Sequence, residues 1–260
     1  MASLKGKVAL ITGASSGIGA AVARHFASLG CYLSLTGRNE ERLNGVGKDC
    51  QQWGLQADQI LLQTGEMSSD ADLERIVLET VERFGRLDVL VNNAGIVKIR
   101  NLEKSTMEMF DTTMDVNVRA VFYLTQLASP HLIKTKGTIV NVSSVVSKVP
   151  SCNTFYGISK YMVDQLTTNA AVELAPYGVR VNSVCPGIIP TPIFERGGMK
   201  WEKVFERSKR QHPLSRPGED TEVASAIAFL ASDNAASITG HHLPIDGGRH
   251  CMPGSPIDAT

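Results

Sequence analysis

Short apolar runs alternate with segments of helical periodicity along the whole chain. The runs are rich in Val, Ile and Leu, which is typical of strands that are buried on both faces. They are KVALIT (7–12), YLSLT (32–36), QILLQ (59–63), LDVLVNNAG (87–95), GTIVNVSS (137–144), VRVNSVCP (179–186) and LPID (243–246). Because parallel neighbours need long crossover connections, this alternation predicts a parallel sheet with helices between its strands.

The segments between the runs carry apolar stripes at helical spacing. One stripe ends at Gly30 and consists of Ile18, Val22, Phe26 and Leu29; another ends at Gly85 and consists of Leu73, Ile76, Val77, Val81 and Phe84. A glycine after the last turn is typical of a C-terminal helix cap. We therefore expect a single α/β domain over residues 1–260, a doubly wound parallel sheet of about seven strands with helices on both faces.

The composition limits the classes of protein to which this chain can belong. Of 260 residues, 43% are hydrophobic, which is enough to fill one large core. The 26 basic and 26 acidic residues balance, so there is no overall charge that would favour nucleic acid or an anionic membrane. The N-terminal segment lacks the apolar core and cleavage site of a secretory signal, and no long apolar run predicts a membrane span. These features predict a soluble cytoplasmic protein.

Cysteine and histidine positions argue against a metal site. The five cysteines, Cys31, Cys50, Cys152, Cys185 and Cys251, are scattered and form no C-x-x-C pair. His241 and His242 are adjacent in an expected strand and therefore face opposite sides. We expect reduced thiols, an inert Cys185 and no catalytic metal.

A glycine-rich turn, TGASSGIG (12–19), connects the first expected strand to a helix. Glycine lets the backbone approach a diphosphate, and the helix N-terminus offers that anion free N–H groups. The residues expected to hold a dinucleotide here are Gly13, Ser15, Ser16, Gly17, Ile18 and Gly19. The alternative is an ordinary tight turn.

The end of the second expected strand indicates which dinucleotide is bound. An NAD site usually offers an acid there for the ribose 2′-hydroxyl, but this strand is followed by Arg38 and Asn39. A guanidinium can bind a 2′-phosphate bidentately, so we predict NADP(H), with NAD(H) possible. The alternative is a surface ion pair of Arg38 with Glu40 or Glu41, which would contribute little.

Tyr156 and Lys160 lie four positions apart in FYGISKYMV (155–163) and share a face of an expected helix. The spacing fits either an exposed side-chain pair or a phenol prepared for proton transfer. With NNAG (92–95), Asn117 in DVNV, Ser143 in NVSS and PGIIPT (186–191), the chain resembles the short-chain dehydrogenase/reductase family. The likeness extends in order and spacing to IDGG (245–248).

The resemblance implies a Rossmann-type enzyme that moves hydride between a nicotinamide and a carbonyl or alcohol. Tyr156 would be the general acid and base, and Lys160 would lower its pKa and hold the nicotinamide ribose. Ser143 would bind the substrate oxygen, and Asn117 would hold a water that links Lys160 to solvent. The resemblance also implies a homotetramer, or a homodimer, that pairs through long helices near 105–128 and 155–175.

Further cofactor contacts follow from the resemblance. They are Asn92, Ala94, Gly95, Pro186, Gly187, Ile189 and Thr191. The family commonly carries Asp-Val against the adenine ring. This chain departs from that pattern, because it has Glu66 and Met67 at the matching positions. Residues 190–212, with Trp201, Val204 and Phe205 at helical spacing, correspond to a substrate lid; the alternative is a solvated amphipathic helix. Residues 251–260 are interpreted as a tail.

These observations favour an NADPH-dependent carbonyl reductase, equivalently an NADP-dependent alcohol dehydrogenase, whose small-molecule substrate is a largely apolar ketone or aldehyde. Val145, Val146, Val149 and Phe155 suggest the apolar preference. Two alternatives stay open: an NAD-dependent alcohol or hydroxysteroid dehydrogenase, and a non-catalytic dinucleotide-binding sensor or scaffold of the same fold. No nucleic-acid partner is expected.

Overall fold

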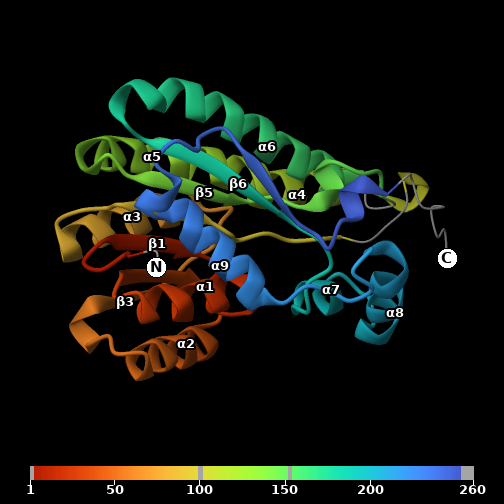
Figure 1. Cartoon of the computed structure of the whole chain (residues 1–260), viewed down its shortest axis with the longest axis horizontal. Coiled ribbons are helices and arrows are strands. Elements are labelled where there is room, and N and C mark those ends of the chain that lie inside the picture. The colour runs from red at the N-terminus through yellow and green to blue at the C-terminus, as the bar shows by residue number, and fades with distance from the viewer. Residues whose placement is uncertain (1–2, 99–101, 152–153, 253–260) are drawn as a thin grey trace.

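The computed structural model describes residues 3–98, 102–151 and 154–252, and its seven strands form one parallel sheet in the order β3-β2-β1-β4-β5-β6-β7 (Figure 1). The strands are β1 (Val8–Thr12), β2 (Tyr32–Gly37), β3 (Ile60–Thr64), β4 (Val89–Asn92), β5 (Thr138–Val142), β6 (Arg180–Pro186) and β7 (His242–Ile245). Each overlaps a predicted apolar run, so the sheet is confirmed. Of the predicted tail, all but Cys251 and Met252 lies outside the described residues.

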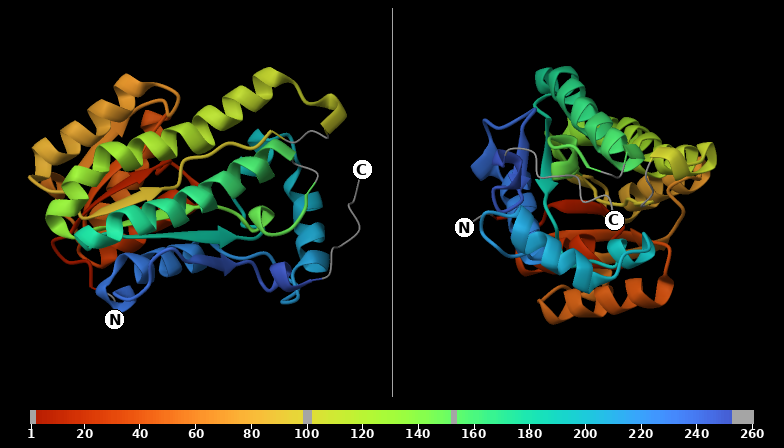
Figure 2. Two further views of the ribbon diagram at one scale, coloured as in Figure 1. Left: turned by 90° about the horizontal axis from the view of Figure 1, so that it is seen from above. Right: turned by 90° about the vertical axis from the view of Figure 1, so that its right-hand side faces the viewer.

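Two layers of helices cover the sheet (Figures 1 and 2). One face carries α1 (Gly17–Ser28), α2 (Glu40–Gln52) and α9 (Asp220–Ala231), and the other carries α3 (Asp70–Phe84), α4 (Met107–Met114), α5 (Ala120–Thr135) and α6 (Thr154–Leu174). The short α7 (Ile193–Arg196) and α8 (Trp201–Gln211) follow β6. None of the helices in the described ranges is long and apolar enough to cross a membrane.

Strand side chains alternate between the two apolar layers. In β1, Ile11 packs with the core under α1, α2 and α9, whereas its neighbour Leu10 packs with the core under α3, α5 and α6. Both are fully buried, and burial of such a side chain contributes roughly 1.5–3 kcal/mol. This two-sided burial explains why the strands are continuous apolar runs rather than alternating ones.

The carboxyl ends of all seven strands meet at one edge of the sheet, since every pair is parallel. The segment with α7 and α8 lies beyond this edge (Figures 1 and 2). In a doubly wound sheet, ligands bind outside the carboxyl ends of the strands. The loops at this edge are therefore where a functional site is expected.

Position 19, in the first turn of α1, requires glycine because of close packing and not because of its backbone conformation. A Cβ at this position would lie 2.5 Å from the Gly13 carbonyl oxygen. We expect Gly19→Ala to lower the free energy of unfolding by about 1–3 kcal/mol, measured by chemical denaturation. Gly45→Ala in α2, where a Cβ meets nothing within 4 Å, is the control and should stabilise slightly. Equal stability of the Gly19 variant and the parent would contradict this account.

Candidate active site

A cavity of about 840 Å³ lies at the carboxyl edge of the sheet. The structure brings most of the predicted site residues together around it. The predicted residues that line it are Gly13, Ser15, Ser16, Gly17, Ile18, Arg38, Asn39, Glu66, Met67, Ala94, Gly95, Ser143, Tyr156, Lys160, Pro186, Gly187, Ile189 and Thr191. Three further predicted site residues do not line the cavity: Gly19, Asn92 and Asn117.

The glycine turn forms one wall of the cavity. Gly13 and Gly17 have φ angles of +66° and +54°, which L side chains rarely adopt. A Cβ on Gly13 would lie 2.9 Å from the Ala94 Cα, so the two loops approach too closely for a side chain at this position. Ser16 begins α1 without a side-chain cap, which leaves the N–H groups of the first turn directed at the cavity. The turn is therefore shaped to receive an anion.

The asparagine that faces this turn is Asn93, and the prediction of Asn92 is corrected. Asn92 ends β4 and is buried, and its amide donates to the Asn141 Oδ1 atom at 2.9 Å. Asn93 lines the cavity, and its Nδ2 atom donates to the Thr12 carbonyl at 2.8 Å. Side chains alternate along a strand, so adjacent asparagines point in different directions and the sequence alone did not say which one faces the loop.

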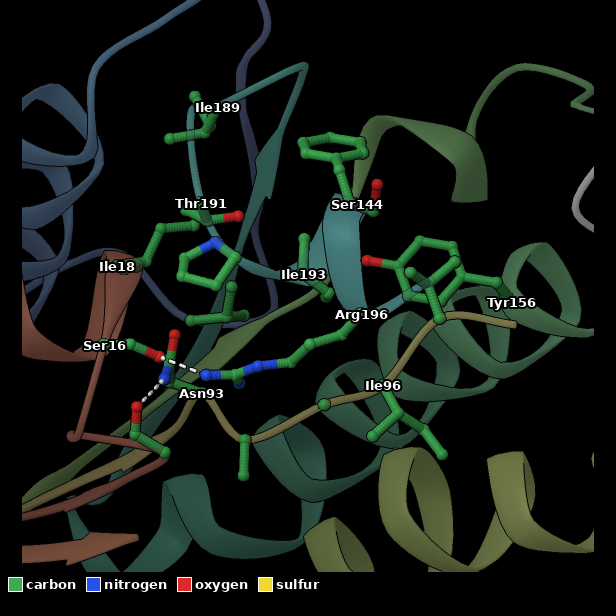
Figure 3. A pocket seen from close by; sticks show the side chains of 18 of the residues that line it. Ser16, Ile18, Asn93, Ile96, Ser144, Tyr156, Ile189, Thr191, Ile193 and Arg196 are labelled. Carbon is green, nitrogen blue, oxygen red and sulfur yellow. Dashed lines mark hydrogen bonds between the residues drawn. The ribbon is translucent and has the colours of Figure 1, made fainter. Parts of the chain in front are cut away.

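Arginines gather where β2 ends. Arg38 lies 4.0 Å from Glu66 and makes no ion pair with Glu40 or Glu41 in the described part of the chain. Arg42, near the start of α2, and Arg196, in α7, line the same end of the cavity and were missed. Arg196 lies 3.4 Å from the Ser16 hydroxyl (Figure 3).

These three guanidiniums are close enough to interact. Burial, and then the positive charges of Arg42 and Arg38, lower the pKa of Arg196. Three adjacent cations with one partly exposed acid, Glu66, make this end of the cavity suitable for a multiply charged anion. No sequence signal indicated Arg196, because it lies far along the chain from the glycine turn.

The Tyr156 hydroxyl lies in the cavity and faces the Ser144 side chain (Figure 3). Ser143 was the serine predicted to bind the substrate oxygen. Ser143 still belongs to the sheet ladder, with its N–H bonded to the Val184 carbonyl, and its hydroxyl donates to the Lys160 carbonyl at 3.1 Å. The ladder thus directs Ser143 toward α6, and Ser144, one residue beyond, faces Tyr156.

Burial raises the pKa of Tyr156 to about 12, and the Ser144 hydrogen bond offsets only part of this effect. The direction is opposite to the one predicted. Lys160, 4% exposed, donates from Nζ to the Val142 carbonyl at 2.8 Å, and its ammonium lies 5.6 Å from the Tyr156 ring centroid. It therefore stands beside the ring rather than at the hydroxyl. Near neutral pH the phenol is protonated, which is the form that can donate a proton.

Asn117 lies in a π-helical turn (Asp115–Arg119) between α4 and α5. Its amide clamps the Ile96 backbone, accepting from the N–H at 2.8 Å and donating to the carbonyl at 2.9 Å, and it also donates to the Ser159 hydroxyl at 3.0 Å. Such bulges are frequent at functional sites. Asn117 thus ties the segment after β4 to α6, while its predicted role in holding a water stays a prediction.

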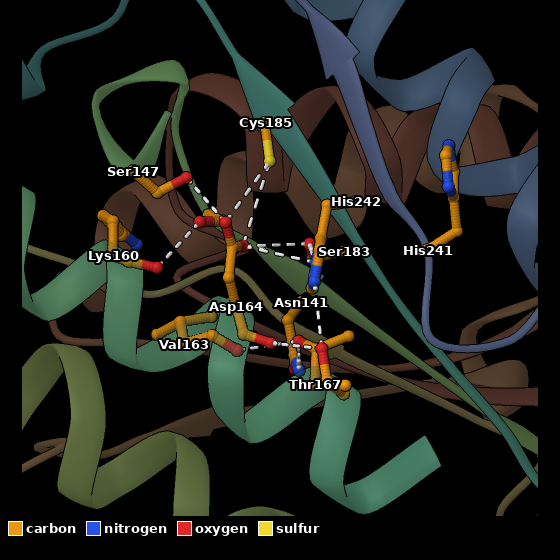
Figure 4. Close-up of polar contacts among 12 residues, drawn as sticks. Asn141, Ser147, Lys160, Val163, Asp164, Thr167, Ser183, Cys185, His241 and His242 are labelled. Atoms are coloured by element: carbon orange, nitrogen blue, oxygen red, sulfur yellow. Dashed lines mark hydrogen bonds and ion pairs between the residues drawn. The ribbon is translucent and has the colours of Figure 1, made fainter. Parts of the chain in front are cut away.

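A buried carboxylate holds the turn after Ser144 against α6 (Figure 4). Asp164 accepts from the Ser147 hydroxyl at 2.6 Å and from the Lys148 ammonium at 2.7 Å. Burial opposes ionisation of this carboxyl, but the hydrogen bonds from Lys148 and Ser147 outweigh it and lower its pKa. Because Ser147 and Lys148 follow Ser144 closely, these contacts fix Ser144 beside Tyr156.

His242 belongs to the same network, with its Nδ1 atom 2.8 Å from the Ser183 hydroxyl, whereas His241 points away (Figure 4). The prediction that the two rings face opposite sides is confirmed. Cys185 is fully buried, and burial raises the pKa of its thiol to about 11, as expected of an inert thiol. Within the described ranges, no group of three or more His, Cys, Asp and Glu side chains is placed to hold a metal ion.

The segment of α7 and α8 closes one side of the cavity. The Trp201 ring packs between Phe194 and Phe205, with centroid separations of 6.1 and 6.2 Å. Val204 is buried and lines the cavity. Gly198, between the two helices, has a φ of +88°. α8 thus meets the cavity through Val204 and Arg207, whereas Trp201 and Phe205 are not among the lining residues.

The parallel sheet, the glycine turn and the Tyr156–Lys160 pair define a Rossmann-type protein, and comparisons with known proteins agree. A family model described as enoyl-(acyl carrier protein) reductase matches residues 13–250. A 3-oxoacyl-[acyl-carrier-protein] reductase of Thermotoga maritima is 40% identical over 94% of this chain and 98% of its own length. A glucose 1-dehydrogenase of Gluconobacter oxydans is 37% identical over 94% of this chain and 91% of its own.

Solved structures give the same result. A short-chain dehydrogenase/reductase of unknown function from Caenorhabditis elegans superimposes with a TM-score of 0.91 at 32% identity, covering 96% of this chain and 97% of that one. Levodione reductase superimposes with a TM-score of 0.91 at 34% identity, covering 96% and 100%. The chain belongs to the short-chain dehydrogenase/reductase family, and it is an oxidoreductase that acts on CH–OH donors with NAD(P) as acceptor.

Proposed function

We propose that this protein is an NADP(H)-dependent carbonyl reductase, equivalently an NADP-dependent alcohol dehydrogenase, with Tyr156 as the general acid and base. The observation that carries the proposal is the position of the Tyr156 hydroxyl inside the cavity, facing Ser144, with the Lys160 ammonium beside the Tyr156 ring. A protein that only sensed or bound the dinucleotide would not need a proton donor at this position.

The residues around the cavity fit a dinucleotide. The α1 N-terminus with Gly13 and Gly17 would hold the diphosphate, because a Cβ at either position would contact the facing loops. Arg38 and Arg42 would hold the 2′-phosphate. Lys160, whose ammonium donates to the Val142 carbonyl, would hold the nicotinamide ribose. NADPH supplies the hydride when it is bound.

In the reductive direction, Tyr156 would donate its proton to the carbonyl oxygen while Ser144 hydrogen-bonds the same oxygen and orients it. Positive charge from Lys160 would then stabilise the phenolate that remains. In the oxidative direction, the phenolate would take the proton from the alcohol. Asp164 does not touch the substrate; it maintains the turn that carries Ser144.

Cofactor preference is the first property to measure. We expect NADPH to bind at least tenfold more tightly than NADH, about 1.4 kcal/mol, in a fluorescence titration of the purified protein. Arg38→Ala and Arg42→Ala should each reduce this preference, and Lys48→Ala, an exposed charge on α2 away from the cavity, should leave it unchanged. Equal or tighter NADH binding would reject NADP(H) specificity, and oxidation of alcohols with NAD would be examined instead.

Two expectations from the family resemblance also enter the proposal. Residues 190–212 would act as a substrate lid, supported by the side chains of Phe194, Met199 and Val204 that line the cavity. The chain would assemble as a homotetramer through α5 and α6, supported by apolar side chains that these helices expose. Phe122 is 54% exposed and Tyr161 is 62% exposed.

A further inference from the structure

The charges that line the cavity are distributed very differently from those of the whole chain. The chain has equal numbers of basic and acidic residues, 26 of each. Among the described residues that line the cavity, Glu66 is the single acid. The basic residues that line it are Arg38, Arg42, Lys98, Lys160, Arg196, Arg207 and Arg249. A cavity of this kind attracts anions throughout its length.

The dinucleotide accounts for only part of this charge. Arg38 and Arg42 lie where β2 ends, toward one side of the sheet, and Arg196 is close to them. Arg249 follows β7, the strand at the opposite edge of the sheet. Tyr156 and Ser144 lie at the ends of α6 and β5, between these two groups. Arg249 therefore stands on the side of Tyr156 away from the expected 2′-phosphate site.

Arg207 shares this second cationic region with Arg249. It lies one turn after Val204 on α8, and both side chains line the cavity. Burial, and then the positive charge of Arg207, lower the pKa of Arg249 to about 10. The two guanidiniums thus come from separate elements, one from the segment over the cavity and one from the sheet edge, and they repel each other.

Among the described residues, Asp246 is the acid that acts on Arg249, and its effect is smaller than those of burial and of the Arg207 charge. The Nε atom of Arg207 is buried without a hydrogen-bond partner, and neither guanidinium belongs to an ion pair in the described part of the chain. Asp246 already accepts from the Gly248 N–H at 3.0 Å and from the His250 N–H at 2.7 Å. An unpaired buried donor and two adjacent like charges both cost stability.

We propose that Arg207 and Arg249 bind a carboxylate on the substrate, so that this enzyme acts on oxo acids whose carbonyl reaches Tyr156. The inference rests on the proposed function and names the substrate class of the same site. Two guanidiniums suit a carboxylate because their N–H groups match its oxygens bidentately. Apolar lining from Val145, Val146 and Ile96 suits the carbon chain between the two ends of such a substrate.

The test compares levulinate and its longer straight-chain homologues with their methyl esters, using NADPH as reductant. We expect kcat/KM to be at least tenfold higher for the acid than for its ester at the best chain length. In Arg207→Gln and Arg249→Gln the ratio of kcat/KM for the acid to that for its ester should fall toward one, mainly because KM for the acid rises. Arg207→Lys should keep part of this ratio. Lys203→Gln, an exposed charge on the same helix outside the cavity lining, is the control.

Esters that react as well as acids at every chain length would overturn the inference while leaving carbonyl reduction intact. The inference would also be overturned if the acid-to-ester ratio fell as much in Lys203→Gln as in the arginine variants. The preference for the acid would then come from long-range attraction and not from a specific site. Binding can be measured without turnover by calorimetric titration with octanoate. Octanoate should bind at least tenfold more tightly than octanol, and only in proteins that keep both arginines. Absence of this difference refutes the carboxylate site whether or not any carbonyl compound is reduced.

Discussion

Tyr156→Phe is expected to lower kcat by at least ~100-fold and to leave NADPH affinity nearly unchanged. The substitution removes one oxygen and keeps the ring, which lies 5.6 Å from the Lys160 ammonium. The proton donor is lost, but the residues that would hold the dinucleotide remain. Steady-state reduction of a carbonyl substrate and a fluorescence titration with NADPH would measure the two effects separately.

The control is Tyr161→Phe, an exposed tyrosine on the same helix that does not line the cavity. Its kcat should match that of the parent protein. Unchanged turnover in Tyr156→Phe would reject this residue as the acid. Absence of turnover in the parent protein for every carbonyl and alcohol tested, together with normal dinucleotide binding, would favour a sensor or scaffold.

Ser144→Ala is expected to lower kcat by roughly 10²–10³-fold, the usual loss when one donor to a developing oxyanion is removed. Ser144 contacts the Tyr156 hydroxyl, so the same substrate oxygen can lie within reach of both groups. Ser143→Ala is the matched control because it removes the adjacent hydroxyl, which is bonded to the Lys160 carbonyl. We expect it to lose less than tenfold in kcat and about 1 kcal/mol of stability.

The pair of variants separates the two serines clearly. If Ser143→Ala were the more impaired enzyme and had normal thermal stability, the placement of Ser144 beside Tyr156 would have to be abandoned. Equal, small losses in both variants would instead mean that the substrate oxygen is held by Tyr156 alone. Both measurements use the same substrate and saturating NADPH.

The sheet could be predicted because its physical cause is local. Leu10 and Ile11 are adjacent, yet both are fully buried, and such continuous apolar runs occur where helices cover both faces. The helix ending at Gly85 was equally clear, since this glycine has the left-handed conformation of a C-terminal cap. The glycine turn and the Tyr156–Lys160 pair followed from spacing along single elements.

Two errors arose where adjacent residues of the same type stand at the end of a strand. Asn92 and Asn93, like Ser143 and Ser144, differ only in the direction of their side chains, which depends on where the ladder ends. Arg196 and Arg207 were missed as cavity residues because a helix after a long loop must first be placed against the sheet. The pKa of Tyr156 was predicted in the wrong direction because burial cannot be read from i and i+4 spacing.

The location of α8 separates the chemistry of this enzyme from its choice of substrate. Tyr156, Ser144 and Lys160 sit on or beside β5 and α6, whereas α8 meets the cavity through Val204 and Arg207 and is joined to the rest by Gly198 and Pro213. Changes in α8, residues 201–211, would therefore alter which molecules are admitted without moving the proton donor. A lineage carrying this chain could acquire new substrates by replacing one short helix while inheriting its reaction unchanged.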